Sequence, residues 1–293
     1  MPIKNTSIKA LLITLLQYIV SHRLPSRLFG VLSRCENEAW KNLIIKKFGK
    51  FYNINTKEAV SRDLKNYPSF NHFFTRQLKP GVRPITELKN GVACPVDGTV
   101  SQAGHITEGQ IFLAKGKKFS IEGLLGGDNK RADLFNSGIF TTLYLSPQDY
   151  HRVHMPVDGT IEVTVHIPGR LFLINNSTIN TVPDLFAKNE RVVNIFNTEA
   201  GPMALILIGS IFSSSIETVW DGVITPSPTS EIRQWNYPFN PPLAKKGEEM
   251  GRFNMGSTVI ILFGKDKVRW ETKLAPGNRV QMGELIGKMT LFD

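Results

Sequence analysis

The chain has 293 residues, of which 41% are hydrophobic and 20% charged, so it can bury a sizeable core and is not an intrinsically disordered protein. Its net charge of +10 is unevenly placed, because residues 1–83 carry 15 Lys and Arg against four Asp and Glu, whereas the remainder is close to neutral. This asymmetry argues against a protein-wide nucleic-acid surface and predicts a basic N-terminal module that meets an anionic surface.

Residues 1–66 are predicted to form a helical, membrane-associating region. The first apolar run, residues 10–20, is shorter than the roughly 18 residues that a spanning helix needs, so we expect it to lie in the membrane interface. A second short helix is predicted to begin at Pro25, and a third to run over about 36–48. Along the third helix, Lys residues including Lys41, Lys46 and Lys47 are interleaved with large apolar residues, which is typical of a helix on anionic lipid. Packing against the body of the protein is the alternative.

Residues 67–91 are predicted to be a connector, and residues 92–293 a β-rich domain. From about residue 92 the sequence consists of short apolar runs broken by Gly, Pro and Asp, which is the pattern of strands and turns. Helical periodicity recurs only over 182–189. The clearest predicted strands cover residues 138–145, 160–167, 203–211, 217–223 and 258–263.

A sequence repeat within the β-rich domain suggests a duplicated architecture. The segment Pro95-Val96-Asp97-Gly98-Thr99-Val100 recurs at residues 156–161, and a looser version closes the chain over 276–287. Asp-Gly between apolar residues is a strong turn signal, so repeated hairpins are expected. We therefore predict an α+β fold whose body is a predominantly β, duplicated barrel or sandwich with an N-terminal helical region.

The tripeptide Gly256-Ser257-Thr258 lies directly before the apolar run 259–263. Glycine leaves its carbonyl uncrowded and tolerates unusual backbone angles, so the next residue's hydroxyl can attack that carbonyl. An acyl shift followed by elimination would break the Gly256–Ser257 bond and convert Ser257 into an N-terminal pyruvoyl group. The tripeptide alone favours the simpler interpretation, an ordinary turn into a strand.

Two of the six histidines, His151 and His154, lie in the turn-like segment 146–156. This His-x-x-His pair has no nearby cysteine and no obvious third ligand, because the only cysteines are Cys35 and Cys94; a metal site is therefore not predicted. Capping of a turn is one alternative, and acid–base chemistry is another. A histidine base near neutral pH needs a carboxylate partner, as in Ser-His-Asp systems. Either Asp97 or Asp158 could supply it, and sequence spacing leaves that choice open.

Four sequence blocks together resemble the phosphatidylserine decarboxylases of the short, bacterial and mitochondrial type. The resemblance covers nearly the whole chain from about residue 40. One departure is Met255 where the family usually has Leu; because the two side chains have similar volumes, we expect processing to survive it. The matching blocks are residues 67–85, Pro95-Val96-Asp97-Gly98, residues 144–156 and residues 247–263.

The resemblance implies specific roles for the residues singled out above. It places a self-processing triad on Asp97, His154 and Ser257, and so selects Asp97 over Asp158. It implies that His151 assists decarboxylation, plausibly by protonating the substrate carbon. Cleavage at Gly256–Ser257 would give a β chain, residues 1–256, and an α chain, residues 257–293, whose pyruvoyl group forms a Schiff base with the substrate amine.

The resemblance also implies the substrate and partners. The expected reaction converts phosphatidylserine to phosphatidylethanolamine and CO₂, with the pyruvoyl group as cofactor and with neither a metal nor pyridoxal phosphate. The expected partners are an anionic phospholipid membrane and the protein's own two chains as a heterodimer, with family likeness suggesting a homodimer of these; nucleic acid is not expected. We expect a peripheral protein at the cytoplasmic face of the inner membrane, which deletion of residues 1–35 would release without preventing self-cleavage.

Two alternative functions use the same residue types. A serine hydrolase would need a nucleophile elbow, and Ser257 lies in no Gly-x-Ser-x-Gly motif. A lipid-binding relative that never processes would need neither the histidines nor the Gly256–Ser257 bond. Both alternatives predict a single uncut chain.

Overall fold

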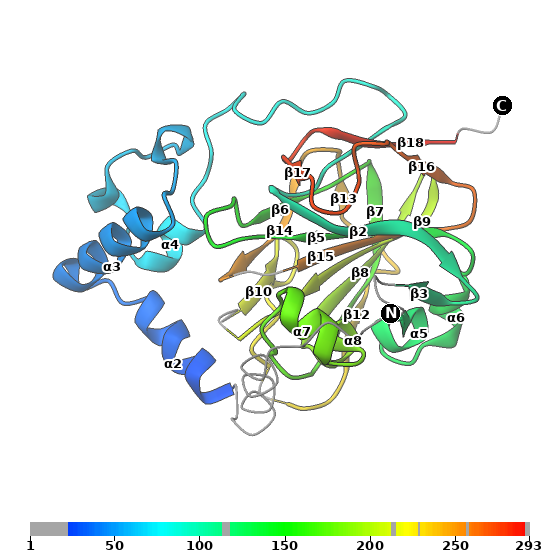
Figure 1. The fold of residues 1–293 in the computed structure, drawn as a ribbon, viewed down its shortest axis with the longest axis horizontal. Helices are drawn as coiled ribbons and strands as arrows, with labels where there is room; N and C mark the ends of the chain where they lie inside the picture. Colours follow the sequence, from blue (N-terminus) through cyan, green and yellow to red (C-terminus); the bar gives the residue numbers. More distant parts are fainter. Residues whose placement is uncertain (1–22, 113–117, 212–214, 228, 256–257, 291–293) are drawn as a thin grey trace, which may run out of the picture.

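The computed structural model describes residues 23–112, 118–211, 215–227, 229–255 and 258–290. A β-rich body carries a smaller group of helices on one side, and the connector between them arches over one edge of the body (Figure 1). None of the described helices is both long and apolar enough to cross a membrane.

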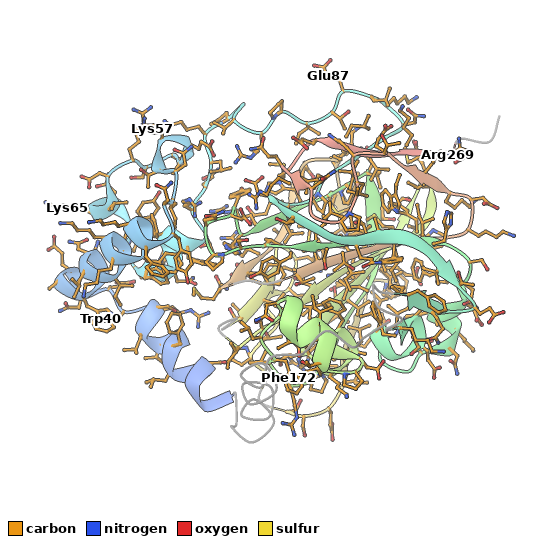
Figure 2. All side chains as sticks on the ribbon, viewed as in Figure 1. Trp40, Lys57, Lys65, Glu87, Phe172 and Arg269 are labelled. Carbon is orange, nitrogen blue, oxygen red and sulfur yellow. The ribbon has the colours of Figure 1, made fainter. Side chains whose placement is uncertain are left out.

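The N-terminal region is helical, as predicted. It comprises α2 (Arg23–Ser33), α3 (Glu38–Phe51), α4 (Phe70–Phe74) and the short 3₁₀ turns Thr56–Glu58 and Leu64–Asn66. The Asn37 side chain caps α3 by accepting a hydrogen bond from the Trp40 backbone amide at 3.1 Å. The helix predicted over residues 10–20 lies outside the described residues. Figure 2 shows Trp40, Lys57 and Lys65 on this helical region, across the molecule from Arg269.

Helix α3 both packs on its neighbours and exposes apolar side chains. Its Ile45 is fully buried in a cluster with three phenylalanines of α4, whereas Leu43 and Phe51 are 50% and 80% exposed. Lys41 departs from the expected lipid-facing role, because its buried ammonium donates to the backbone carbonyls of Lys65 and Tyr67 at 2.8 and 2.6 Å. The sequence pattern missed this because Lys41 lies on the same helix face as Ile45.

The body is built around a large antiparallel sheet whose strands follow a non-sequential order. In spatial order its strands are β12 (Arg233–Asn236), β7 (Gly159–Ile167), β8 (Arg191–Thr198), β9 (Gly201–Ile208), β15 (Thr258–Phe263), β5 (Ile139–Tyr144), β2 (Gly98–Thr107), β3 (Gln110–Phe112) and β4 (Lys118–Ser120), with β13 (Leu243–Ala244) on β7 and β17 (Arg279–Val280) on β2.

Two smaller sheets complete the strand structure. One has the order β11 (Gly222–Val223), β10 (Ser215–Thr218), β14 (Glu249–Asn254) and β6 (Arg152–His154). The other has the order β1 (Gly91–Ala93), β18 (Leu285–Met289) and β16 (Val268–Trp270). All the strand pairs are antiparallel, and the described strands form open sheets, so the α+β prediction is confirmed as a sandwich and not as a closed barrel.

Strand β15 runs through the middle of the large sheet and is buried on both faces. Its Val259 and Ile261 belong to the core beneath the smaller sheets, and Ile260 and Leu262 to the core on the opposite face. This alternation follows from the period of two along a strand. The second core is closed by residues of the short helices α5 (Ile121–Leu124), α6 (Asn129–Asp133) and α8 (Leu185–Lys188), with α7 (Asn176–Thr181) on the same side (Figure 1).

The repeated Pro-Val-Asp-Gly turns occupy equivalent places, each leading into a long strand of the large sheet, β2 and β7. They also lie side by side. The Ala93 amide donates to the Pro156 carbonyl and the His154 amide to the Pro95 carbonyl, both at 2.9 Å. The sequence repeat therefore corresponds to two neighbouring turns that lead into β2 and β7. The domain limits at residues 66 and 91 stay predictions.

Candidate active site

The segment from Tyr144, at the end of β5, to His154, at the end of β6, carries the candidate acid–base residues. The Asp149 carboxylate fixes its turn by accepting a hydrogen bond from the Ser146 amide at 2.7 Å. The same carboxylate forms an ion pair with Arg279, with Nη2 and Oδ1 separated by 2.6 Å. This anchoring ties the turn to β17 and directs the following residues, Tyr150 and His151, into the protein, where both are buried.

Both sides of the expected cleavage point are anchored to this segment. Before it, the Phe253 amide at the end of β14 donates to the His151 carbonyl at 3.0 Å. After it, Thr258 begins β15 and pairs with Tyr144 of β5. Met255 has a φ of 84°, a left-handed conformation that costs a non-glycine residue on the order of 1 kcal/mol or more. Gly256 and Ser257 themselves lie outside the described residues.

His154 on β6 has a defined tautomer. Its Nδ1 lies 2.8 Å from the Gly247 carbonyl oxygen, and because a carbonyl can only accept, Nδ1 carries the proton. Nε2 therefore has the free lone pair, and the Tyr150 hydroxyl, 3.2 Å away, donates to it. Burial lowers the pKa of His154 below its usual value, against the opposing effect of the Gly247 carbonyl. His154 is thus neutral near pH 7 and chemically suited to accept a proton.

Asp97 is buried close to His154 but has other hydrogen-bond partners. Its carboxylate accepts from Arg83 Nη2 at 2.6 Å and Nε at 2.9 Å, and from the Met282 amide at 2.9 Å. The tautomer of His154 is therefore fixed by the Gly247 carbonyl and not by a hydrogen bond to Asp97. Asp97 still acts through space, because its negative charge favours the protonated form of His154 and so raises the pKa of the imidazole.

The alternative carboxylate, Asp158, lies at the surface. Its side chain is about half exposed, accepts from the Lys246 amide at 2.7 Å and pairs with Lys245 Nζ at 3.2 Å. The hydrogen bond from the Lys246 amide lowers the pKa of Asp158, and the Lys245 ammonium lowers it further. Of the two candidates that sequence spacing left open, only Asp97 is buried, and its charge acts on His154.

His151 is fully buried, with its ring stacked on Phe74 at a centroid distance of 4.0 Å and an interplanar angle of 23°. Neither ring nitrogen has a hydrogen-bond partner of good geometry among the described residues. Burial lowers the pKa of His151 to about 3; the charge of Arg76 adds to this effect, and the carbonyls of Pro147 and Ser146 oppose it weakly. A buried imidazole with both nitrogens unpaired is costly unless a ligand supplies the partner.

An apolar cavity of about 300 Å³ lies between the helical region and the body, and it reaches Met255 and Phe74. Met255 is the residue before the expected cleavage dipeptide, and Phe74 is the one that stacks on His151. The cavity therefore ends beside the candidate site. Its remaining lining residues are Phe29, Ile44, Phe48, Tyr52, Phe70, Tyr144, Leu145, Pro147, Leu173, Ile174 and Ser210.

Asp97 interacts electrostatically with His154, and His151 lies three residues before His154 on the same segment; the roles assigned to these residues stay predictions. Sequence reasoning missed Tyr150 as the partner of His154 and Arg83 as the partner of Asp97. Tyr150 directly precedes the candidate His151, which was the available signal for it; Arg83 lies in another matching block, and nothing in the sequence links it to Asp97. Among the described residues, no three His, Cys, Asp or Glu side chains gather in a way that could hold a metal ion.

Comparison with known proteins identifies the family. The family model described as phosphatidylserine decarboxylase matches residues 70–288. A second family model, described as PSD, matches residues 12–53. The chain belongs to the phosphatidylserine decarboxylase family. The predicted family and enzyme class are thereby confirmed.

Full-length relatives agree with this assignment. The chain is 49% identical over 283 residues to the phosphatidylserine decarboxylase proenzyme of Pseudomonas putida (strain GB-1), covering 96% of this chain and 98% of the relative. It is 48% identical over 286 residues to the proenzyme of Ectopseudomonas mendocina (97% and 100% covered) and 50% identical over 281 residues to that of Bordetella avium (96% and 95% covered). The word proenzyme in these names describes proteins that require processing.

Proposed function

We propose that this chain cleaves its own backbone at Gly256–Ser257 and then decarboxylates phosphatidylserine to phosphatidylethanolamine and CO₂. One observation carries the proposal: the residues on both sides of that bond pair with the single segment that bears His151 and His154, through Phe253 and Thr258. Family membership supports the substrate and the reaction.

For the cleavage step we assign His154 as the base. Its neutral form has the lone pair on Nε2, because Nδ1 donates to the Gly247 carbonyl. Removal of the Ser257 proton leaves an imidazolium, which the nearby negative charges of Glu249 and Asp97 stabilise. The same proton can return to the nitrogen that leaves as the peptide becomes an ester. Asp97 therefore stabilises the positive charge of the imidazolium, and His154 accepts and returns the proton.

The buried residues fit a pyruvoyl group derived from Ser257, which we propose as the cofactor. When formed, this ketone supplies the electron sink that the departure of CO₂ requires. His151 fits such a site because neither of its buried ring nitrogens has a hydrogen-bond partner of good geometry among the described residues, so they are available to a substrate. Stacking on Phe74 fixes the ring orientation. His151 is thus placed to deliver a proton to the carbon that loses CO₂ once the negative charge of the bound substrate favours the protonated ring.

We further propose that the helical region docks the protein on an anionic membrane, at the cytoplasmic face of the inner membrane. Helix α2 exposes Leu28 and Val31 at 63% and 70%, and α3 exposes Phe51 at 80%. Three exposed lysines flank this apolar surface, namely Lys46, Lys47 and Lys50. The apolar cavity opens between this region and the body, so an acyl chain could enter it from a bilayer. A homodimer stays a prediction.

A decarboxylation assay with two variants tests the proposal. Vesicles containing phosphatidylserine labelled in the serine carboxyl carbon are mixed with the wild-type protein, with S257A and with H151N. We expect labelled CO₂ from the wild type, none from S257A, which lacks the cleavage nucleophile, and roughly a hundredfold less from a cleaved H151N. Release of CO₂ by S257A at the wild-type rate would overturn the proposal. Vesicle binding without CO₂ release by any of the proteins would favour the non-processing relative.

A further inference from the structure

Part of the wall of the apolar cavity comes from two segments of the body that lie outside its strands. Leu173 and Ile174 belong to the loop between β7 and α7, and Ser210 follows the end of β9. Because neither segment is part of a strand ladder, other interactions must hold it in place against the cavity. The position of this wall therefore depends on what binds the two segments to the sheet.

The side chain of Asn189, just before β8, joins these two segments. Its Oδ1 accepts from the Phe172 amide at 3.1 Å, and its Nδ2 donates to the carbonyls of Phe172 and Gly209, both at 2.9 Å. Phe172, which is labelled in Figure 2, directly precedes Leu173, and Gly209 directly precedes Ser210. One fully buried amide thus fixes the residue that leads into each of these two parts of the wall.

The orientation of this side-chain amide follows from its partners. The Phe172 amide can only donate and the two carbonyls can only accept, so the positions of Oδ1 and Nδ2 cannot be exchanged. The backbone of Asn189 is held as well, because its carbonyl accepts from Arg191 Nη1 at 2.9 Å and its amide donates to the Leu185 carbonyl at 3.1 Å. A side chain with one possible orientation on an anchored backbone can set the spacing between two segments.

A neutral amide is what these three partners require. Alanine at position 189 would leave the buried Phe172 amide and the two buried carbonyls without this partner, which favours a shift of both segments. A charged aspartate would face two carbonyl oxygens, and burial disfavours its charge. The loss of Asn189 should therefore displace the cavity wall while the strands stay paired.

The same cavity connects this wall to the candidate active site. Phe74, whose ring stacks on His151, and Pro147 also line it. The lining is predominantly apolar, so hydrocarbon is the ligand chemistry that it recognises. An acyl chain held against Leu173 and Ile174 would therefore fix where the rest of the lipid lies relative to His151.

We propose that Asn189 is a positioning residue that sets the shape of this cavity and thereby the preference of the protein for the acyl chains of phosphatidylserine. The inference rests on the proposed decarboxylation, which makes this lipid the substrate. Asn189 does not touch the lipid; it acts through Leu173, Ile174 and Ser210. Each methylene that loses its contact with the wall weakens binding about fourfold. Displacement of the wall should therefore reduce the preference for longer acyl chains.

The first test measures binding to uncleaved S257A protein, so that no turnover intervenes. The probes are phosphatidylserines with two octanoyl or two butanoyl chains, and calorimetry gives the ratio of their Kd values, the octanoyl preference. The matched control is N194A in the same background, because Asn194 is also fully buried and its side chain bonds to Thr164 and Leu205, which do not line the cavity. We expect N189A to lower the octanoyl preference at least about fourfold, and N194A to leave it within about twofold of S257A alone.

The comparison separates a positioning role from a merely structural one. Both substitutions remove a buried amide that stabilises the body, so thermal unfolding should show a loss of stability in each. Only N189A should change the octanoyl preference. A preference in N189A within about twofold of S257A alone would overturn the proposal, and so would an equal loss of preference in N194A.

A second pair of variants keeps the proposal testable if N189A does not fold. N189D has nearly the volume of asparagine, and its buried carboxyl group, held protonated, can still donate to one of the two carbonyls. The octanoyl preference of N189D should therefore be lower than that of S257A alone, whereas N194D should keep it. An unchanged preference in N189D would reject the role of Asn189.

The proposed function and the role of Asn189 fail in different measurements. Release of CO₂ by the wild-type protein tests the reaction, and the binding preference of the uncleaved variants tests the cavity wall. If the wild type releases no CO₂ while the octanoyl preference still depends on Asn189, the decarboxylation fails and the positioning role stands. If the wild type releases CO₂ and N189A keeps the full octanoyl preference, only the role of Asn189 is rejected.

Discussion

At the scale of single residues, burial determines the protonation state of the candidate site. His151 and His154 are both held neutral by burial, and Tyr150 is held as a phenol. Their positions differ in one respect: His154 has a partner on each nitrogen, whereas His151 has none among the described residues. This contrast fits His154 as a base for a reaction within the chain, and it leaves the ring nitrogens of His151 open to an external substrate.

The low pKa of His151 predicts a loss of stability in acid. The ring binds a proton near pH 6.5 when unfolded but only near pH 3 when folded, so between these values the unfolded state binds more protons. The free energy of unfolding should therefore fall by about 2 kcal/mol between pH 7 and pH 5 because of this residue. Denaturant unfolding of uncleaved S257A protein should show this slope, and a further H151N substitution should flatten it. Equal slopes with and without H151N would contradict the burial argument.

The ion pair between Arg83 and Asp97 predicts a second residue-scale effect. Both side chains are under 10% exposed, and the Arg83 hydrogen bonds to Asp97 raise the pKa of the guanidinium. R83M in the S257A background leaves a buried carboxylate without its main partner and should lower the free energy of unfolding by about 3–5 kcal/mol. The double variant R83M/D97N should recover much of this loss. If the two substitutions instead add independently, the pair is not coupled.

At the scale of elements, the sequence predicted the strands better than the short helices. Strands β5, β7, β9 and β15 have clear apolar runs bounded by turn residues, and each agrees with its prediction to within a few residues. Helices α5 to α8 have only four to six residues, too few for a helical period to show. The hydrogen bond between His154 and the Gly247 carbonyl could not be predicted either, because the two residues are 93 positions apart in the sequence.

The place of β15 predicts that the two chains stay together after cleavage. It lies between β5 and β9 in the middle of the large sheet, and Met282 and Arg279 farther along the α chain bond to Asp97 and Asp149. Both cleavage products should therefore co-elute as one particle in native gel filtration and separate only in denaturant. Release of the smaller chain under native conditions would show that β15 does not hold it.

At the scale of the whole molecule, the charge asymmetry of the sequence coincides with the division between helical region and body. Family and fold class could be predicted because they depend on motifs and periodicity. The burial of Lys41 against Lys65 and Tyr67 could not be predicted, because it depends on tertiary packing. Polarity alone does not reveal which face of α3 meets the body.

Membrane docking through α3 predicts a specific charge dependence. The variant K46Q/K47Q/K50Q should bind vesicles rich in anionic lipid roughly a hundredfold more weakly than wild type, at about 1 kcal/mol for each lysine. The matched control is K118Q/K130Q/K265Q, which removes three exposed lysines of the body. Sedimentation with vesicles measures both. Equal losses for the two variants would mean that net charge, and not the surface of α3, controls binding.

The central claim is that the chain cuts itself at Gly256–Ser257, and the intact mass of the purified protein tests it most directly. The account predicts two chains, residues 1–256 and residues 257–293, with the smaller one blocked at its N-terminus by the pyruvoyl group. S257A should remain one chain of 32.8 kDa. A wild-type protein found only as a single species of 32.8 kDa would contradict the account.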